Sequence, residues 1–255
     1  MTASSEPTAD EALAVALAER AVAALVSLRT GSELEGRALK DAGDARAQAV
    51  LAAGLAEARS ADAVLSEEAV DDPRRLDADR VWIIDPLDGT REYSEHRDDW
   101  AVHVALWTRE AGLVAGAVAS PGSLRTTAGP TPLPSRDPTR PPRLAVSRTR
   151  APALVVALAE RLGAETVPMG SAGVKAMAVV AGTVDAYVHG GGQYEWDSAA
   201  PVAVARAAGL HTSRLDGSPL VYNRPDPWLP DLVVCRPELA ELLLTTIAEI
   251  PQEDA

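Results

Sequence analysis

The stretch Val81–Tyr93, VWIIDPLDGTREY in one-letter code, constrains the fold more than any other part of the sequence. Residues 81–84 are apolar and partly β-branched, which is typical of a buried strand. Because proline lacks a backbone donor for the sheet, we expect the strand to end at Pro86. Asp85 and Asp88 should therefore lie together at the end of the strand, where α/β folds place their ligands.

The aspartates Asp85 and Asp88 would repel each other unless a proton or a cation lies between them. Hard oxygen ligands of this kind suit Mg²⁺, which commonly binds a few carboxylates and keeps places for water and phosphate oxygens. The next residues, Gly89 and Thr90, can turn backbone N–H groups toward an anion. The alternative is an aspartate-rich turn that caps a helix, and this stretch alone does not decide between the two.

The composition excludes several kinds of partner. A net charge of −13 repels nucleic acid and anionic membranes, and it would repel an anionic substrate unless bound cations reverse the local field. Cys235 is the only cysteine, so neither a disulfide framework nor a cysteine zinc site is expected. No apolar run approaches the length of a membrane span, and residues 1–10 carry no signal-peptide pattern. We expect a cytoplasmic protein with a small-molecule partner, no nucleic-acid or membrane partner, and a homodimer left open.

Two domains joined by a linker are predicted. Residues 8–125 read as helices followed by a strand hairpin, which is an α+β pattern, whereas residues 143–250 alternate strand and helix. Between them, at 126–142, the periodicity fails and six prolines fall between Pro130 and Pro142. Such a segment is typical of a loop or linker. The predicted class is therefore α/β with an α+β first half.

Three polar positions have a structural interpretation. Asp44 is expected at the N-cap of a helix from about Ala45 to Arg59. His103 lies on the polar face of a strand over Trp100–Trp107, and we interpret it as structural. His189 with three following glycines mimics an oxyanion-hole motif of esterases, but the sequence has no G-x-S-x-G motif to accompany it. The glycines therefore predict a turn.

A set of acidic residues falls at the predicted ends of strands or starts of helices. Each member alone is explained by a cap or a solvated turn. Together, spread over the chain, they suggest ligands that converge on one metal cluster. The set is Asp44, Glu67, Asp85, Asp88 and Asp197.

Two motifs carry a resemblance to a known family. They are WIIDPLDGT at 82–90 and WDSAAP at 196–201, about a hundred residues later. With them the sequence resembles the inositol monophosphatase-like superfamily of Mg²⁺-dependent, lithium-sensitive phosphatases, over nearly the whole chain. The resemblance implies a layered αβαβα sugar-phosphatase fold with two subdomains.

The resemblance also implies roles for individual residues. Thr90 and Asp44 would form a hydrogen-bonded pair that activates the attacking water, and the backbone N–H groups of Gly89 and Thr90 would hold the phosphate. Two or three Mg²⁺ ions would be bound by four carboxylates and one backbone carbonyl. These metal ligands would be Glu67, Asp85, Asp88, Asp197 and the carbonyl of Leu87.

The triplet at 91–93, Arg-Glu-Tyr, favours the branch of CysQ-type 3′(2′),5′-bisphosphate nucleotidases of actinobacterial type. That branch implies removal of the 3′-phosphate of 3′-phosphoadenosine 5′-phosphate (PAP) to give AMP. Arg148, Ser171 and Lys175 match stretches that approach the nucleotide there. The alternatives are a broader sugar-phosphate phosphatase, acting on inositol 1-phosphate or fructose 1,6-bisphosphate, and a metabolite sensor without catalysis.

The sequence departs from the family pattern at three places. Ser66 replaces a glycine before the acidic pair, and the segment Lys40–Asp44 is shorter than the common loop. The proline-rich stretch 121–142 replaces the usual hairpin. We therefore expect the first domain to lack one or two strands.

Overall fold

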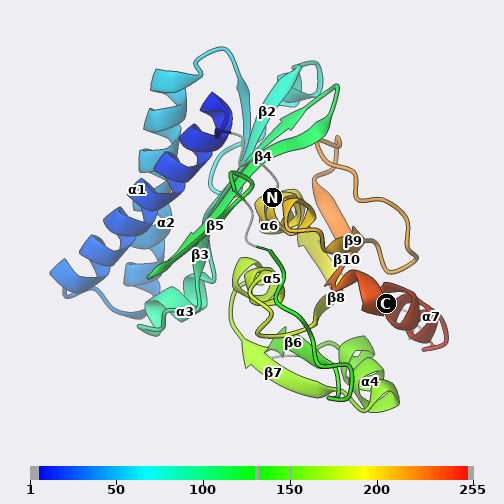
Figure 1. Ribbon diagram of the computed structural model, residues 1–255. Coiled ribbons are helices and arrows are strands. Elements are labelled where there is room, and N and C mark those ends of the chain that lie inside the picture. Colours follow the sequence, from blue (N-terminus) through cyan, green and yellow to red (C-terminus); the bar gives the residue numbers. More distant parts are fainter. Residues whose placement is uncertain (1–5, 130–131, 150, 252–255) are drawn as a thin grey trace.

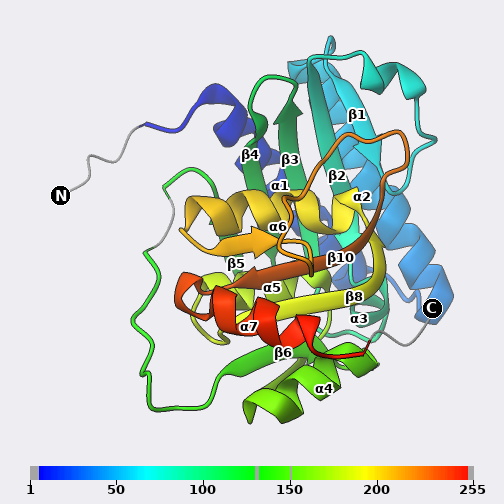
Figure 2. The ribbon, with the colours of Figure 1, turned by 90° about the vertical axis from the view of Figure 1, so that its right-hand side faces the viewer.

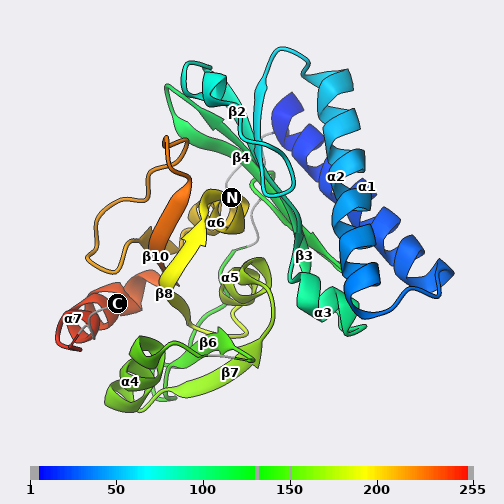
Figure 3. The same ribbon diagram turned by 180° about the vertical axis from the view of Figure 1, so that it is seen from behind.

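The computed structural model describes residues 6–129, 132–149 and 151–251. Helices and sheets alternate in five layers, with a helix pair on one outer side, two sheets inside, a helix layer between the sheets, and a second helix pair on the other outer side (Figures 1 and 3). This arrangement confirms the predicted αβαβα fold.

The first layer is an antiparallel pair of long helices, α1 (Ala9–Gly31) and α2 (Gly36–Ala58). A capping box between Thr8 and Glu11 starts α1. The predicted position of Asp44 at a helix start is wrong, because α2 begins earlier and continues through it. Gly43 has a packing reason to be in this helix: a Cβ there would lie 2.8 Å from the ring of Tyr93.

The first sheet has the strand order β1-β2-β3-β4-β5. Only β1 and β2 are parallel, and the remaining neighbours are antiparallel. The predicted end of the strand over residues 81–84 at Pro86 is wrong, since β2 continues to Asp88 across a shift of register between Asp85 and Asp88. The strands are β1 (Ala63–Ser66), β2 (Arg80–Asp88), β3 (Ala101–Thr108), β4 (Gly112–Ser120) and β5 (Ser123–Thr126).

The expected loss of one or two strands relative to the family stays a prediction. The stretch 121–142 does begin with a hairpin, since β5 continues from β4 with Ser120 paired to Ser123. Ser66, at the end of β1, is buried, and its hydroxyl donates to Gln48 Oε1 at 2.8 Å. The serine thus joins the strand end to α2 where the family pattern has a glycine.

The middle layer holds α5 (Ala172–Val180) and α6 (Glu195–Ala207), which lie between the two sheets (Figure 2). The central core packs residues from both halves of the chain, such as Ile83 of β2 and Val202 of α6. The domain boundaries at 125 and 143 stay a prediction, and residues 130 and 131 of the proposed linker lie outside the described residues.

The second sheet has the order β7-β6-β8-β10-β9. The three glycines after His189 lie inside β8 and form no hairpin turn: Gly190 pairs with Asp231 of β10, and Gly191 and Gly192 fall in the shift of register between that pair and the pair of Gln193 with Leu229. Residues 219–222, within the described part of the chain, form no strand. The strands are β6 (Arg143–Ser147), β7 (Glu165–Met169), β8 (Ala186–Tyr194), β9 (His211–Ser213) and β10 (Trp228–Cys235).

The last layer, formed by α4 and α7, covers the outer face of the second sheet with a separate apolar cluster. Gly163 closes α4 in the left-handed conformation. None of the helices in the described ranges is long and apolar enough to cross a membrane. The remaining helices are α3 (Thr90–Ser94), α4 (Ala153–Leu162), α7 (Ala240–Ala248) and two short 3₁₀ turns, Pro73–Leu76 and Pro237–Leu239.

Candidate active site

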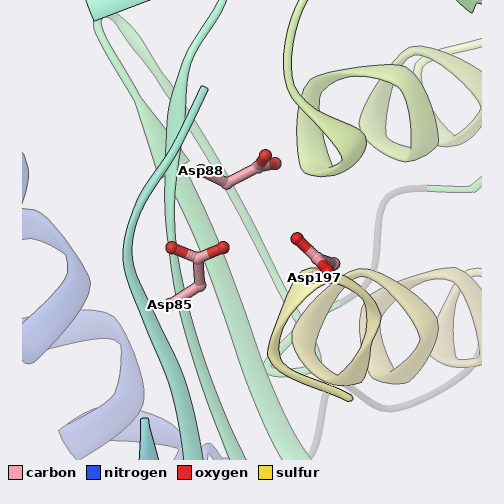
Figure 4. A group of neighbouring side chains, drawn as sticks. All are labelled: Asp85, Asp88 and Asp197. Carbon is pink, nitrogen blue, oxygen red and sulfur yellow. The ribbon is translucent and has the colours of Figure 1, made fainter. Parts of the chain in front are cut away.

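Three aspartates from separate elements meet between the first sheet and the middle helix layer (Figure 4). Asp85 and Asp88 come from the irregular end of β2, and Asp197 comes from the first turn of α6. One oxygen from each side chain lies within 4.8 Å of the others. The fold therefore brings together residues that are more than a hundred positions apart in the sequence.

Each aspartate uses one oxygen for the protein and leaves the other without a hydrogen bond in the described residues. Asp85 Oδ1 accepts from Leu87 N at 3.0 Å, while its Oδ2 is buried and has no partner there. Asp197 Oδ2 accepts from Tyr194 N at 2.6 Å. Asp88 Oδ2 accepts from Gly173 N at 2.7 Å and from the hydroxyl of Ser171. The protein thus fixes the orientation of three carboxylates and leaves an oxygen of each for a ligand.

The electrostatics of this group call for a cation. Burial raises the pKa of Asp85 well above its usual range, and the charge of Asp88 raises it further. Burial and the charge of Asp88 raise the pKa of Asp197 to about 7. The three carboxylates offer only oxygen ligands, and they cannot all be charged unless a cation lies among them. Both properties fit a hard divalent ion such as Mg²⁺.

His103 takes part in this site, although the sequence suggested only a structural role. Its ring is fully buried, with Nδ1 3.1 Å from the carbonyl oxygen of Trp196 and Nε2 3.3 Å from Asp88 Oδ2. Burial alone would raise the pKa of Asp88, but His103 and the bonds from Ser171 and Gly173 lower it to about 2. No motif marks His103, so only the pairing of β3 with β2 reveals it.

Two further predicted metal ligands lie beside the group of three. Glu67 follows β1 at the exposed rim, where partial desolvation and the charges of Glu68 and Asp88 raise its pKa. Leu87 lies within the register shift of β2, between the two aspartates. The ligand roles of Glu67 and of the Leu87 carbonyl stay predictions.

The predicted catalytic pair, Asp44 and Thr90, lies on α2 and α3, which pack against each other. Asp44 is buried, its Oδ1 has no hydrogen-bond partner in the described part of the chain, and burial together with Glu68 raises its pKa to about 7. No hydrogen bond joins Asp44 to Thr90 within residues 6–129. Their role in activating water therefore stays a prediction.

Gly89 makes a sharp turn between β2 and α3. Its φ of +89° is a left-handed conformation, and a Cβ would lie 3.2 Å from the Cβ atoms of both Ser171 and Trp100. Thr90 is then the first residue of α3, where backbone N–H groups lack acceptors within the helix. This geometry is compatible with the predicted phosphate contacts of Gly89 and Thr90, which no observation tests.

A cavity of about 370 Å³ opens beside the aspartates, and Asp197 lines one side of it. Lys175 of α5 lines it as well. Its Nζ donates to the carbonyl oxygens of Ser171, at 2.6 Å, and Gly170, at 3.2 Å. Burial lowers the pKa of Lys175, while the charges of Asp88 and Glu92 oppose that change. The volume of this cavity is in the range of small-molecule sites.

The other predicted substrate residues are already engaged. Arg148 Nη2 donates to Glu92 Oε1 at 2.8 Å and to Glu95 Oε2 at 2.9 Å. Ser171 caps α5 and bonds to Asp88, so it supports the metal ligands directly. The structure thus brings Ser171 and Lys175 to the aspartates, while the side chain of Arg148, just after β6, is bonded to Glu92 of α3 and to Glu95. Substrate contacts for all three stay predictions.

Known proteins match this chain along most of its length. The family model for the inositol monophosphatase family matches residues 6–252. A 3′-phosphoadenosine 5′-phosphate phosphatase of Mycobacterium leprae is 51% identical over 95% of both chains. The 3′(2′),5′-bisphosphate nucleotidase CysQ of Escherichia coli is 31% identical, over 74% of this chain and 81% of its own.

Solved structures agree with these matches. CysQ of Bacteroides thetaiotaomicron superposes with a TM-score of 0.77 at 26% identity, covering 89% of this chain and 96% of its own. An inositol monophosphatase of Staphylococcus aureus shares the fold, with a TM-score of 0.78 at 19% identity over 93% and 92% of the two chains. With its fold, its acidic site and the full-length sequence match in agreement, the chain belongs to the inositol monophosphatase family.

Proposed function

We propose that this protein is a Mg²⁺-dependent 3′(2′),5′-bisphosphate nucleotidase that removes the 3′-phosphate of PAP and releases AMP. The observation that carries the proposal is the group of three aspartates, each with one oxygen held by the protein, of which Asp197 lines a cavity that also contains the buried Lys175. The names of the relatives support the choice of substrate. A cytoplasmic location and a homodimer remain part of the proposal.

The residues that would hold two or three Mg²⁺ ions are Asp85, Asp88 and Asp197, with Glu67 at the rim. When bound, these ions supply the positive charge that offsets the phosphate and lowers the pKa of the attacking water. Asp85, whose free oxygen is buried, cannot be solvated by bulk water and so depends on a ligand for its charge.

The chain's own residues then position the reactants and accept a proton from the attacking water. Asp44 has a raised pKa and an unpartnered oxygen, so it can accept a proton near neutral pH, directly or through the hydroxyl of Thr90. Backbone N–H groups at Gly89 and Thr90 orient the phosphate for in-line attack. The ammonium group of Lys175, held by two carbonyls, adds a positive charge to the cavity wall.

A panel of phosphate-release assays with Mg²⁺ tests the proposal. We expect kcat/KM to be higher for PAP than for inositol 1-phosphate and fructose 1,6-bisphosphate. A preference for inositol 1-phosphate would overturn the nucleotidase assignment and leave a metal-dependent phosphatase. Binding of PAP without release of phosphate from any of the three would instead indicate a sensor.

A further inference from the structure

His103 contacts the surroundings of all three aspartates, although it is not one of the predicted metal ligands. It lies opposite Asp85 in the pairing of β3 with β2. Its Nε2 lies 3.3 Å from Asp88 Oδ2, outside hydrogen-bond geometry. Its Nδ1 lies 3.1 Å from the carbonyl oxygen of Trp196, the residue before Asp197. One fully buried side chain therefore touches β2 and α6, the two elements that carry the aspartates (Figure 4).

The bond to Trp196 ties the first turn of α6 to the first sheet. A carbonyl oxygen can only accept, so Nδ1 of His103 donates in this bond. Within the described residues no other hydrogen bond joins α6 to this sheet, and apolar contacts such as that of Ala203 with Gly116 make up the rest of the interface. Apolar packing is not directional, whereas a hydrogen bond is. The bond therefore fixes where the start of α6, and Asp197 with it, lies relative to β2.

Gly173 of α5 is matched to the same ring. Glycine weakens a helix relative to alanine, so a glycine inside α5 calls for a reason. A Cβ at this position would overlap Nε2 of His103 and would lie 2.9 Å from Cε1. The backbone N–H of Gly173 donates to Asp88 Oδ2 at 2.7 Å. The missing side chain thus lets α5 approach the ring and the carboxylate together.

We propose that His103 is a positioning residue of the metal site, which sets the distance between Asp88 on β2 and Asp197 on α6. The ring is fully buried and does not line the cavity, so its effect reaches the metal through these two carboxylates. Residues that orient metal ligands tune the affinity for the metal. The inference rests on the proposed function, because it requires both aspartates to bind Mg²⁺.

The first test titrates metal-free protein with Mg²⁺ in a calorimeter. His103→Leu removes both ring nitrogens, and we expect the Kd for Mg²⁺ to rise roughly 10- to 100-fold, as for other residues that orient metal ligands. In His103→Asn the amide nitrogen can replace Nδ1 and keep the bond to Trp196, so the Kd should stay within about fivefold of wild type. The inference is wrong if His103→Leu binds Mg²⁺ as wild type does, or if the two variants lose affinity equally.

Kinetics separate positioning of the metal ligands from contact with the substrate. In phosphate-release assays with PAP, the Mg²⁺ concentration for half-maximal rate should rise in His103→Leu by the same factor as the Kd. At saturating Mg²⁺, KM for PAP should stay within about twofold of wild type, because His103 does not line the cavity. A raised KM for PAP with an unchanged Mg²⁺ requirement would overturn the inference.

Gly173→Ala tests the same contact from the side of α5. The added Cβ should displace the ring and raise the Kd for Mg²⁺ by roughly 10-fold or more. In the His103→Asn background, which lacks Nε2 and Cε1, the same substitution should raise the Kd by less than about twofold. An equal effect in both backgrounds would contradict the fit of the ring against α5, and the inference with it.

Val104→Ala is the control for a loss of packing. Val104 follows His103 in β3, is fully buried, and points to the opposite face of the sheet, where it packs in the cluster of Trp82. It should lower Tm and leave the Kd for Mg²⁺ unchanged. If Val104→Ala and His103→Leu weaken Mg²⁺ binding equally, His103 has only a structural role.

The behaviour of wild type separates this inference from the proposed function. If wild type binds Mg²⁺ and hydrolyses PAP while every His103 variant keeps the wild-type Kd, the positioning role is wrong and the proposed function stands. If wild type itself binds no Mg²⁺, both fail.

Discussion

Asp185 provides the sharpest test of how the proline-rich segment is held. Its side chain is fully buried and pairs with Arg140 through two bonds of 2.7 and 2.8 Å. Oδ2 also accepts from Arg143 N at 2.8 Å, while Arg236 Nε lies 3.3 Å from Oδ1. One carboxylate thus joins the loop before β6, the start of β6 and the end of β10.

We predict that Asp185→Asn destabilises the protein by about 3–5 kcal/mol, because it removes one charge from a buried network and leaves guanidinium groups uncompensated. The free energy of unfolding at pH 7 is measured by urea denaturation. The control is Asp98→Asn, whose side chain is 71% exposed and pairs only at the surface with Arg29. That variant should cost less than about 1 kcal/mol.

The pH dependence gives a second readout. Burial alone would raise the pKa of Asp185, but the bonds from Arg140 and Arg143 lower it below its usual value. A carboxyl with a lowered folded-state pKa stabilises the protein above its unfolded pKa of about 3.9, and this contribution is lost as the pH falls through the folded pKa. The difference between wild type and Asp185→Asn should therefore shrink at acidic pH. A difference that is the same at about pH 3 and pH 7, or no larger than for Asp98→Asn, would refute the reasoning.

Further predictions concern the active site. Excess chelator should abolish phosphate release, and Li⁺ should inhibit it; full turnover in chelator would contradict the metal assignment. Asp88→Asn and Asp197→Asn should each nearly abolish turnover, and near-normal turnover of either variant would argue against a ligand role. Without Mg²⁺, the Tm of Asp197→Asn should stay the same or rise because carboxylate repulsion is relieved. Asp88→Asn should lower Tm, because the Asp88 carboxylate accepts from Ser171 and Gly173. Thr90→Ala should lower kcat by roughly 10²–10⁴-fold with little change in the Mg²⁺ concentration needed for activity. A higher Mg²⁺ requirement with unchanged kcat would instead indicate that Thr90 binds the metal. Lys175→Met should lower kcat/KM for PAP by roughly 10- to 100-fold, as for the loss of a charged hydrogen bond, and should lower it less for inositol 1-phosphate. Equal losses on both substrates would indicate that Lys175 acts only by stabilising the Gly170–Ser171 turn.

The sequence predicted the layered fold and the residues that meet at the aspartates because both depend on short, dense motifs. Asp85 and Asp88 are separated by two residues, so any local conformation keeps them close. The details within the motif were less predictable. Pro86 lacks an N–H, yet β2 continues past it, since a shift of register leaves no ladder bond for that residue to donate.

Asp44 and the glycines of β8 show a second limit of sequence patterns. A short polar residue before an alanine-rich run is the usual sign of a helix start, but Gly43 packs against Tyr93, and this tertiary contact is compatible with a helix that runs on through both residues. Three glycines usually mark a turn, but those after His189 lie within β8, where Gly190 pairs with β10 and Gly192, in the shift of register, gives Trp228 room. In each case a partner distant in sequence decides the local conformation.

His103 could not have been identified from the sequence. A histidine on the polar face of a strand becomes significant only when β2 places Asp88 beside it, at 3.3 Å. A metal site consists of residue types that have few other uses together, so short motifs predict it. A single histidine in a strand is common, and only the pairing of β3 with β2 gives it a metal-site carboxylate as a neighbour. Residues that position the metal ligands should therefore be sought in the fold, in addition to the motifs.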